Sequence, residues 1–173
     1  MDEAAALPRS RFLDIGRQGE ALTFSFARCF EDVVGLSLRR PEAYRAARVA
    51  LKSVGSVSWL TEGLTFSLDS KMTAASDIAA MLNEIDQRLE GIAERPLSAH
   101  MVERALGITA RERSRWTKDG RLARAGTNLI RRGHLIALST YAVAEIARLM
   151  NEPGTIRAWR EADDRGREGD KSA

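Results

Sequence analysis

A short, arginine-rich segment with its own start and stop signals constrains this chain more than any other part of its sequence. Thr109 and Glu112 have the Thr-x-x-Glu spacing of a capping box, in which each side chain bonds the other residue's backbone N–H at the start of a helix. Gly120 can adopt the left-handed conformation with which helices commonly end. The spacing therefore predicts a helix over 109–118, anchored by Trp116, its one large apolar residue.

The residues around this helix predict a helix–turn–helix followed by a β-hairpin. Ser98 can cap a short helix that ends at Gly107, so that a tight turn separates the two helices. Further along, apolar and polar residues alternate on both sides of Gly133, a residue that suits the turn of a hairpin. A last helix is expected to be capped by Ser139 and to end before Pro153.

Positive charge is concentrated in the same part of the chain. The formal net charge of the protein is +3, but residues 95–138 contain ten cations and three acids, a local net charge of +7 that leaves −4 on the rest. Nine of the ten cations are arginine, which can bind phosphates or guanine edges through two parallel hydrogen bonds. A solvated charged surface is the plain alternative, but the coincidence with a capped helix favours a surface that binds nucleic acid.

The order of helix, turn, arginine-bearing helix, basic hairpin and closing helix resembles the winged helix-turn-helix of the MerR and phage excisionase group. The resemblance covers residues 97–150 and rests on Leu106-Gly107-Ile108-Thr109 and on Arg115-Trp116 followed by Gly120-Arg121-Leu122. It implies that the helix over 109–118 enters the major groove of double-stranded DNA. It also implies that the hairpin lays Arg131 or Arg132 along the backbone or the minor groove.

The resemblance supplies a set of candidate DNA-contacting residues. Those expected nearest the bases are Arg111, Glu112, Ser114 and Arg115. The set also contains the cap residue and the flanking cations: Thr109, Arg113, Lys118, Arg121, Arg124, Arg131 and Arg132. At Arg113 the family usually has an apolar residue, so we expect the Arg113 stem to cross Trp116 while its charge faces outward.

The N-terminal part, residues 12–94, contains two expected helices and two segments whose periodicity leaves the structure open. Helices are expected over 41–54 and over 73–93, the second with an apolar stripe that we interpret as a core face rather than a dimer seam. Residues 20–30 and 62–68 fit either a helical face or an alternating strand, and we favour helix for the first. The two segments echo each other at an interval of 42 residues, by duplication or by coincidence.

These elements predict a mainly α fold with two domains. The first is a helical N-terminal domain over 12–94 that serves dimerisation or sensing, and the second is a winged helix-turn-helix over 97–150. The tail over 162–173 lacks apolar residues, and it is expected to be disordered.

Several function classes find little support in the sequence. Cys29 is the only cysteine, expected as a small buried hydrophobe, and with His100 and His134 as the only histidines no metal or other cofactor is expected. The chain has no glycine-rich phosphate loop or nucleophile elbow, so an enzyme is not expected. It has no apolar run of about 18 residues and no export signal, so a cytoplasmic protein without membrane contact is expected.

The sequence therefore predicts a sequence-specific DNA-binding protein, either a transcriptional regulator or a recombination or plasmid accessory factor. A homodimer is expected, because two copies would read two half-sites and add their binding free energies. The alternative is a winged-helix interaction module whose positive charge binds an acidic partner protein.

Overall fold

The computed structural model describes residues 8–51, 57–60, 65–69 and 74–170. The chain divides into two compact units, Met1–Glu94 and Arg95–Ala173, and each unit is described by itself. The division lies between the two domains that the sequence predicts.

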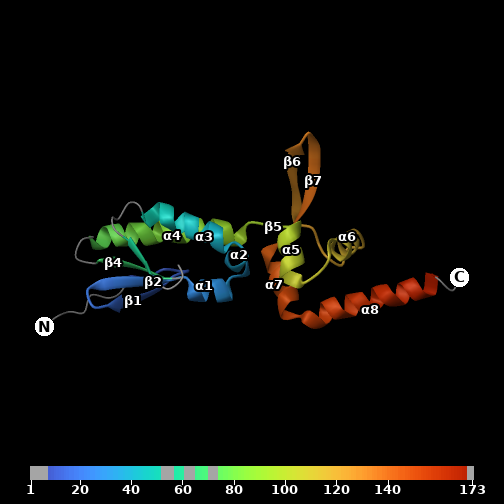
Figure 1. Cartoon of the computed structure of the whole chain (residues 1–173), viewed down its shortest axis with the longest axis horizontal. Coiled ribbons are helices and arrows are strands. Elements are labelled where there is room, and N and C mark those ends of the chain that lie inside the picture. The colour runs from blue at the N-terminus through green and yellow to red at the C-terminus, as the bar shows by residue number, and fades with distance from the viewer. Residues whose placement is uncertain (1–7, 52–56, 61–64, 70–73, 171–173) are drawn as a thin grey trace. The chain divides into compact units, whose positions relative to one another are not determined.

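Unit 1 contains two successive strand–strand–helix segments that share one antiparallel sheet with the strand order β1-β2-β4-β3. The first segment comprises β1 (Asp14–Gln18), β2 (Ala21–Ser25), α1 (Ala27–Asp32), α2 (Val34–Ser37) and α3 (Arg40–Leu51). The second comprises β3 (Val57–Leu60), β4 (Thr65–Asp69) and α4 (Ala75–Glu94). The helices α3 and α4 pack against each other (Figure 1).

This sheet shows that the prediction of a helical N-terminal domain, and of a mainly α fold, is wrong. The segment 20–30 forms β2 followed by α1, and the described part of 62–68 belongs to β4. In β2, Leu22 and Phe24 are buried while their neighbours are partly exposed, which is the two-residue period of a strand with one buried face. The fold is therefore mixed α/β.

The 42-residue echo corresponds to the two central strands of this sheet. β2 and β4 are adjacent and antiparallel, and Phe24 lies opposite Phe66. Their rings stack with centroids 4.8 Å apart. Because these residues are themselves 42 positions apart, equivalent positions of the two strand–strand–helix segments meet at the middle of the sheet.

The apolar stripe of α4 faces the core of its own unit, which confirms the core-face interpretation. Its buried residues are Ile78, Met81, Leu82, Ile85, Leu89, Ile92 and Ala93. α2 approaches this helix so closely that a Cβ atom on Gly35 would overlap the carbonyl oxygen of Ala93. The predicted ends of the two long helices at Val54 and Thr73 lie outside the described residues.

Cys29 lies in the same core, as the sequence predicts for a small hydrophobe. It is 3% exposed, and burial raises the pKa of its thiol to about 12. The thiol therefore stays protonated near neutral pH, where only the thiolate would be reactive.

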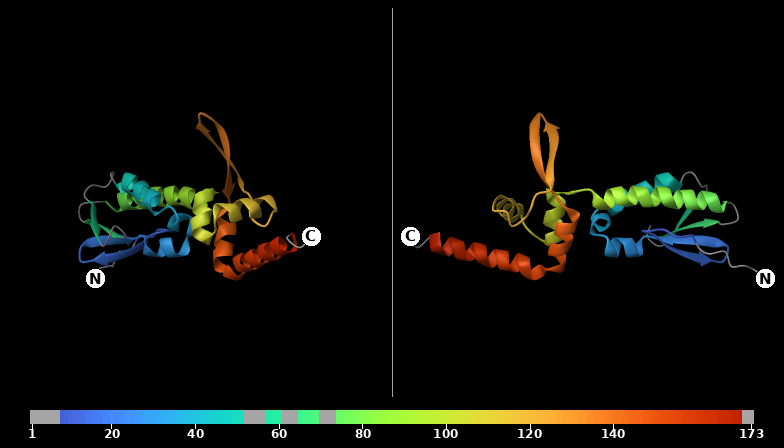
Figure 2. Two further views of the ribbon diagram at one scale, coloured as in Figure 1. Left: turned by 45° about the vertical axis from the view of Figure 1, so that its right-hand side comes forward. Right: turned by 180° about the vertical axis from the view of Figure 1, so that it is seen from behind.

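Unit 2 combines the predicted helix–turn–helix with a three-stranded antiparallel sheet of order β5-β7-β6. Its elements are β5 (Leu97–Ser98), α5 (Ala99–Leu106), α6 (Ala110–Lys118), β6 (Gly126–Arg132), β7 (His134–Tyr141), α7 (Val143–Asn151) and α8 (Pro153–Asp170). The β6–β7 hairpin turns at Gly133, which has a φ of 74°, and its far end extends beyond the helices of this unit (Figure 2).

Two features of unit 2 differ from the prediction. Ser139 lies within β7, and α7 begins only at Val143, without a side-chain cap. The tail over 162–173 is helical as far as Asp170, and its last three residues lie outside the description. The prediction of a disordered tail is therefore wrong. The helix α8 begins before the tail, and its first turns are held in the unit because Ile156 is buried and Trp159 packs on α6.

Candidate nucleic-acid interface

The ends of α6 are fixed by the signals that predicted them. The N–H of Glu112 donates to Oγ1 of Thr109 at 3.1 Å, and the N–H of Thr109 donates to Oε2 of Glu112 at 2.7 Å, which completes the capping box. Gly107 ends α5 in the left-handed conformation with a φ of 60°. Gly120, with a φ of 85°, follows the last turn of α6. A helix of only nine residues is thus defined at both ends.

Arg160 of α8 binds the same capping box from outside. Its Nε donates to Oε1 of Glu112 at 2.7 Å, and its Nη2 donates to the carbonyl oxygen of Gly107 at 2.9 Å. The hydrogen bond from Arg160, together with those involving Thr109, lowers the pKa of Glu112 from its usual 4.5 to about 2. The Glu112 carboxylate, one of the residues expected nearest the bases, is therefore occupied in holding the start of α6.

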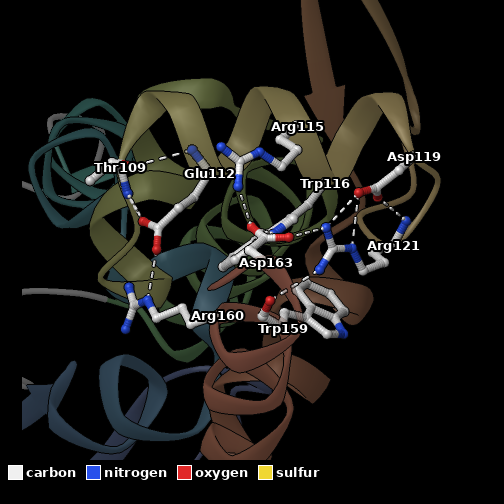
Figure 3. Close-up of polar contacts among 9 residues, drawn as sticks. All are labelled: Thr109, Glu112, Arg115, Trp116, Asp119, Arg121, Trp159, Arg160 and Asp163. Carbon is white, nitrogen blue, oxygen red and sulfur yellow. Dashed lines mark hydrogen bonds and ion pairs between the residues drawn. The ribbon is translucent and has the colours of Figure 1, made fainter. Parts of the chain in front are cut away.

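Trp116 anchors α6 in the unit, and Asp163 of α8 is its polar partner. The Trp116 side chain is fully buried and meets Trp159 edge to face, with ring centroids 5.0 Å apart. Its Nε1 donates to Oδ2 of Asp163 at 3.0 Å. The same carboxylate accepts from Nη1 of Arg115 and Nη2 of Arg121, each at 2.7 Å (Figure 3). One carboxylate therefore joins α6, the segment after it and α8.

Asp163 remains ionised in this position. Its side chain is only 10% exposed, and burial by itself would raise its pKa. The hydrogen bonds from Arg121, Trp116 and Arg115 outweigh burial and lower the pKa below its usual value. The negative charge thus persists and neutralises part of the charge of the two arginines.

Arg113 and Arg121 are also held within the unit. Arg113 donates from Nε to Oε1 of Glu103 at 2.8 Å and from Nη1 to the hydroxyl of Tyr141 at 3.1 Å, and its side chain is 19% exposed. The guanidinium of Arg121 lies over the Trp116 ring, 5.6 Å from its centroid. The prediction that the charge of Arg113 faces outward is therefore wrong, because Glu103 and Tyr141 bind that charge within the unit.

A second set of side chains points away from unit 2. Arg111, Ser114 and Lys118 are exposed, and their spacing of three and four residues places them on one face of α6. Arg124, just after the helix, and Arg131, on the hairpin, are exposed as well. In residues 8–51, 57–60, 65–69 and 74–170, no hydrogen bond or ion pair involves any of these four cations.

The eleven candidate residues thus fall into different environments. Thr109 and Glu112 form the cap, Arg113 and Arg121 are paired inside, and Arg111, Ser114, Lys118, Arg124 and Arg131 face outward. Arg115 is intermediate, with a side chain that is 39% exposed and one nitrogen bound to Asp163. Arg132 belongs to β6, but its side chain lies outside the described residues.

The sequence interpretation missed the helix α8 and, with it, the contacts that Arg160 and Asp163 make with α6. A signal was present, because Ile156, Trp159 and Asp163 follow Pro153 at intervals of three, three and four residues. Proline suits the first turn of a helix, and this spacing is typical of a helix with one docked face. The many charges of the segment hide that pattern.

Comparisons with protein families, with curated proteins and with solved structures found no match. Within the described ranges, no helix is long and apolar enough to cross a membrane. Nor do three histidine, cysteine or acidic side chains come together there in a way that could hold a metal ion.

Proposed function

We propose that unit 2 binds double-stranded DNA in a sequence-specific manner by placing α6 in the major groove. The observation that carries this proposal is the outward face of α6, where Arg111, Ser114 and Lys118 are exposed and the two cations have no partner among the residues that the structure describes. An α-helix fits the major groove of B-DNA, and such side chains can bond base edges there. Transcriptional regulation, or assistance to recombination or plasmid maintenance, would use this activity.

The two sets of cations would serve binding in different ways. Arg111, Ser114 and Lys118 would face the base edges, while Arg124 and Arg131 would bind phosphates and so fix the register of the protein on the duplex. The paired side chains around Asp163 hold α6 in place before DNA arrives. Such preorganisation lowers the entropy lost on binding.

Selection of duplexes from a random pool by the full-length chain tests this proposal. We expect one sequence motif to be enriched. A palindromic motif would further support our proposal that two copies read two half-sites as a homodimer. Failure to enrich any sequence, together with no mobility shift of a mixed-sequence duplex, would contradict DNA binding.

Single variants on the selected duplex locate the contact. Arg111→Ala and Lys118→Ala should each weaken binding roughly 10-fold, within the range of about 1–3 kcal/mol for the loss of a base contact. Arg157→Ala is the matched control, because Arg157 is an exposed arginine of α8 and its removal changes the net charge equally. Equal losses in all three variants would indicate binding by overall charge alone. Preference for an acidic protein competitor over the duplex would favour the interaction-module alternative.

A further inference from the structure

The β6–β7 hairpin carries most of the exposed large apolar side chains in the described part of the protein. Leu129 is 62% exposed, Leu135 is 66% exposed and Leu138 is 41% exposed, while Val49 and Met150 are the others. Single exposed leucines are common on protein surfaces. Three of them within ten residues, on a ribbon that extends beyond the helices, indicate a surface that contacts something else (Figure 2).

The register of the hairpin places two of these leucines beside an arginine. Leu129 lies opposite Ala137, and Arg131 lies opposite Leu135. Alternate residues of a strand share one face of the sheet, so Leu129, Arg131, Leu135 and Ala137 form a contiguous patch. We call these four residues the ribbon patch. Leu138, opposite Asn128, lies on the other face.

The charge of the hairpin favours a polyanion as the occupant of this patch. From Gly126 to Tyr141 the sequence contains two arginines and no aspartate or glutamate. Arg131 is exposed and has no partner in the described part of the chain, in contrast to Arg113, which is paired with Glu103. A second copy of the ribbon would bring like charges together, which is unfavourable, whereas a polyanion would be attracted.

The length of the ribbon suits a groove next to the one that α6 would occupy. Six residue steps separate Gly126 from Arg132, which corresponds to about 20 Å of strand. One turn of duplex measures about 34 Å, so the centres of neighbouring major and minor grooves are roughly 17 Å apart along the axis. The ribbon patch, in the outer half of the hairpin, can therefore reach the adjacent minor groove.

We propose that the ribbon patch inserts into the DNA minor groove and bends the duplex. Leu129 and Leu135 act as an apolar wedge at a base step, and Arg131 binds a phosphate at the edge of the groove beside them. Apolar side chains that enter the minor groove partly unstack a step and kink DNA toward the major groove. The negative potential of a narrow minor groove attracts arginine. This inference depends on the proposed function, because α6 is what brings the ribbon to the duplex.

A bending measurement on the full-length chain tests the inference. The probe is a duplex recovered by random-pool selection and labelled with a donor and an acceptor dye at its two ends. Binding of the parent protein should shorten the end-to-end distance, as expected for a kink of roughly 20–90°. The Leu129→Ala/Leu135→Ala double variant should still bind but lose this shortening. Leu138→Ala, the control on the opposite face, should bend the duplex as the parent does.

The outcomes separate this inference from the proposed function. Binding by the parent without a change in the end-to-end distance would overturn the wedge and leave DNA binding intact, whereas no binding at all would remove both. Equal bending by the double variant would also overturn the wedge. Two other results would overturn the wedge if the double variant still bends DNA. One is a loss of self-association, which would indicate that the leucines contact a second copy of the chain, and the other is a loss of binding to phosphatidylglycerol vesicles, which would indicate a lipid surface. Circular dichroism should show a folded double variant, because both leucines are exposed.

Discussion

Positively charged side chains have different roles on the inward and outward sides of the α6 region. Arg113, Arg115 and Arg121, the inward set, bind carboxylates of the same unit. Arg111, Lys118, Arg124 and Arg131, the outward set, are exposed and have no partner among the described residues. The difference teaches that the local net charge of a sequence overstates the charge offered to a partner, because pairing within the fold removes part of it.

The division between the two sets depends on residues that lie far along the chain. Asp163 supplies the carboxylate for Arg115 and Arg121, and it belongs to α8, 48 residues after Arg115. A nine-residue helix is not stable by itself in water. The inward set therefore contributes to holding α6, and the outward set remains available for binding.

The change with the largest expected effect removes the anchor on the inward side. Trp116→Ala deletes a fully buried indole and should lower the free energy of unfolding by about 3–5 kcal/mol. Trp116→Phe keeps an apolar ring but loses the Nε1 bond to Asp163, so it should cost less. Urea unfolding followed by circular dichroism measures both. A loss below about 1 kcal/mol for the alanine variant would show that α6 is not held by this residue.

The next change removes the charge that joins α6 to α8. Asp163→Asn should lower stability by about 2 kcal/mol, since hydrogen bonds to charged groups contribute roughly 1.5–3 kcal/mol. It also frees Arg115 and Arg121 of their shared carboxylate, so binding to a mixed-sequence duplex should become tighter. Glu161→Gln, an exposed position of the same helix, is the control for charge and should change stability by less than about 0.5 kcal/mol. Equal effects of the two variants would contradict the special role of Asp163.

Loss of two outward cations should have the opposite pattern. Arg124→Ala/Arg131→Ala, the variant that lacks the two cations assigned to phosphates, should leave the free energy of unfolding within about 0.5 kcal/mol of the parent. Its DNA binding should depend less on salt, with the slope of log K against log salt reduced by about 2. Thermal unfolding and binding titrations at several salt concentrations measure the two effects. A variant that loses stability but keeps the salt slope of the parent would show that these cations hold the fold and do not bind DNA, which contradicts their assignment to the outward set.

The local structure of unit 2 could be predicted because each signal acts over a few residues. Thr109 and Glu112 are three residues apart, Ser98 caps α5 through Met101, and Gly133 turns the hairpin. The carboxylate partners could not be predicted in the same way. Many acidic residues of the chain could pair with Arg115, and only the docking of α8 selects Asp163.

In unit 1 the periodicity of residues 20–30 fits both a helix and a strand, and pairing with a distant segment decides between them. Leu22, Phe26 and Phe30 fit one face of a helix, whereas Leu22, Phe24 and Phe26 fit a strand. The strand is formed because β4 provides both a hydrogen-bonding edge and Phe66, 42 positions after Phe24, for Phe24 to stack on. The echo marked the two segments that pair, but a short pattern that occurs twice in a sequence does not by itself show that its two copies are adjacent strands.

The prediction with the smallest expected effect on stability concerns the cap of α6. It tests whether the charge of Glu112, like the inward arginines, helps to hold the helix in unit 2. Glu112→Gln keeps the shape of the capping side chain but removes the charge that Arg160 binds. At pH 7 we expect a loss of about 1 kcal/mol, typical of a weakened helix cap. Glu161→Gln again serves as the control for charge alone.

The pH dependence of this loss follows from the pKa of Glu112, which is about 2 in the folded protein against a usual value of 4.5. A lowered pKa means that the carboxylate stabilises the fold fully above pH 4.5, and that this contribution disappears as the pH falls toward about 2. Parent and Glu112→Gln should therefore differ in unfolding free energy at pH 7 and converge in acid. An undiminished difference near pH 2 would show that the carboxylate charge, and hence Arg160, has no part in holding α6.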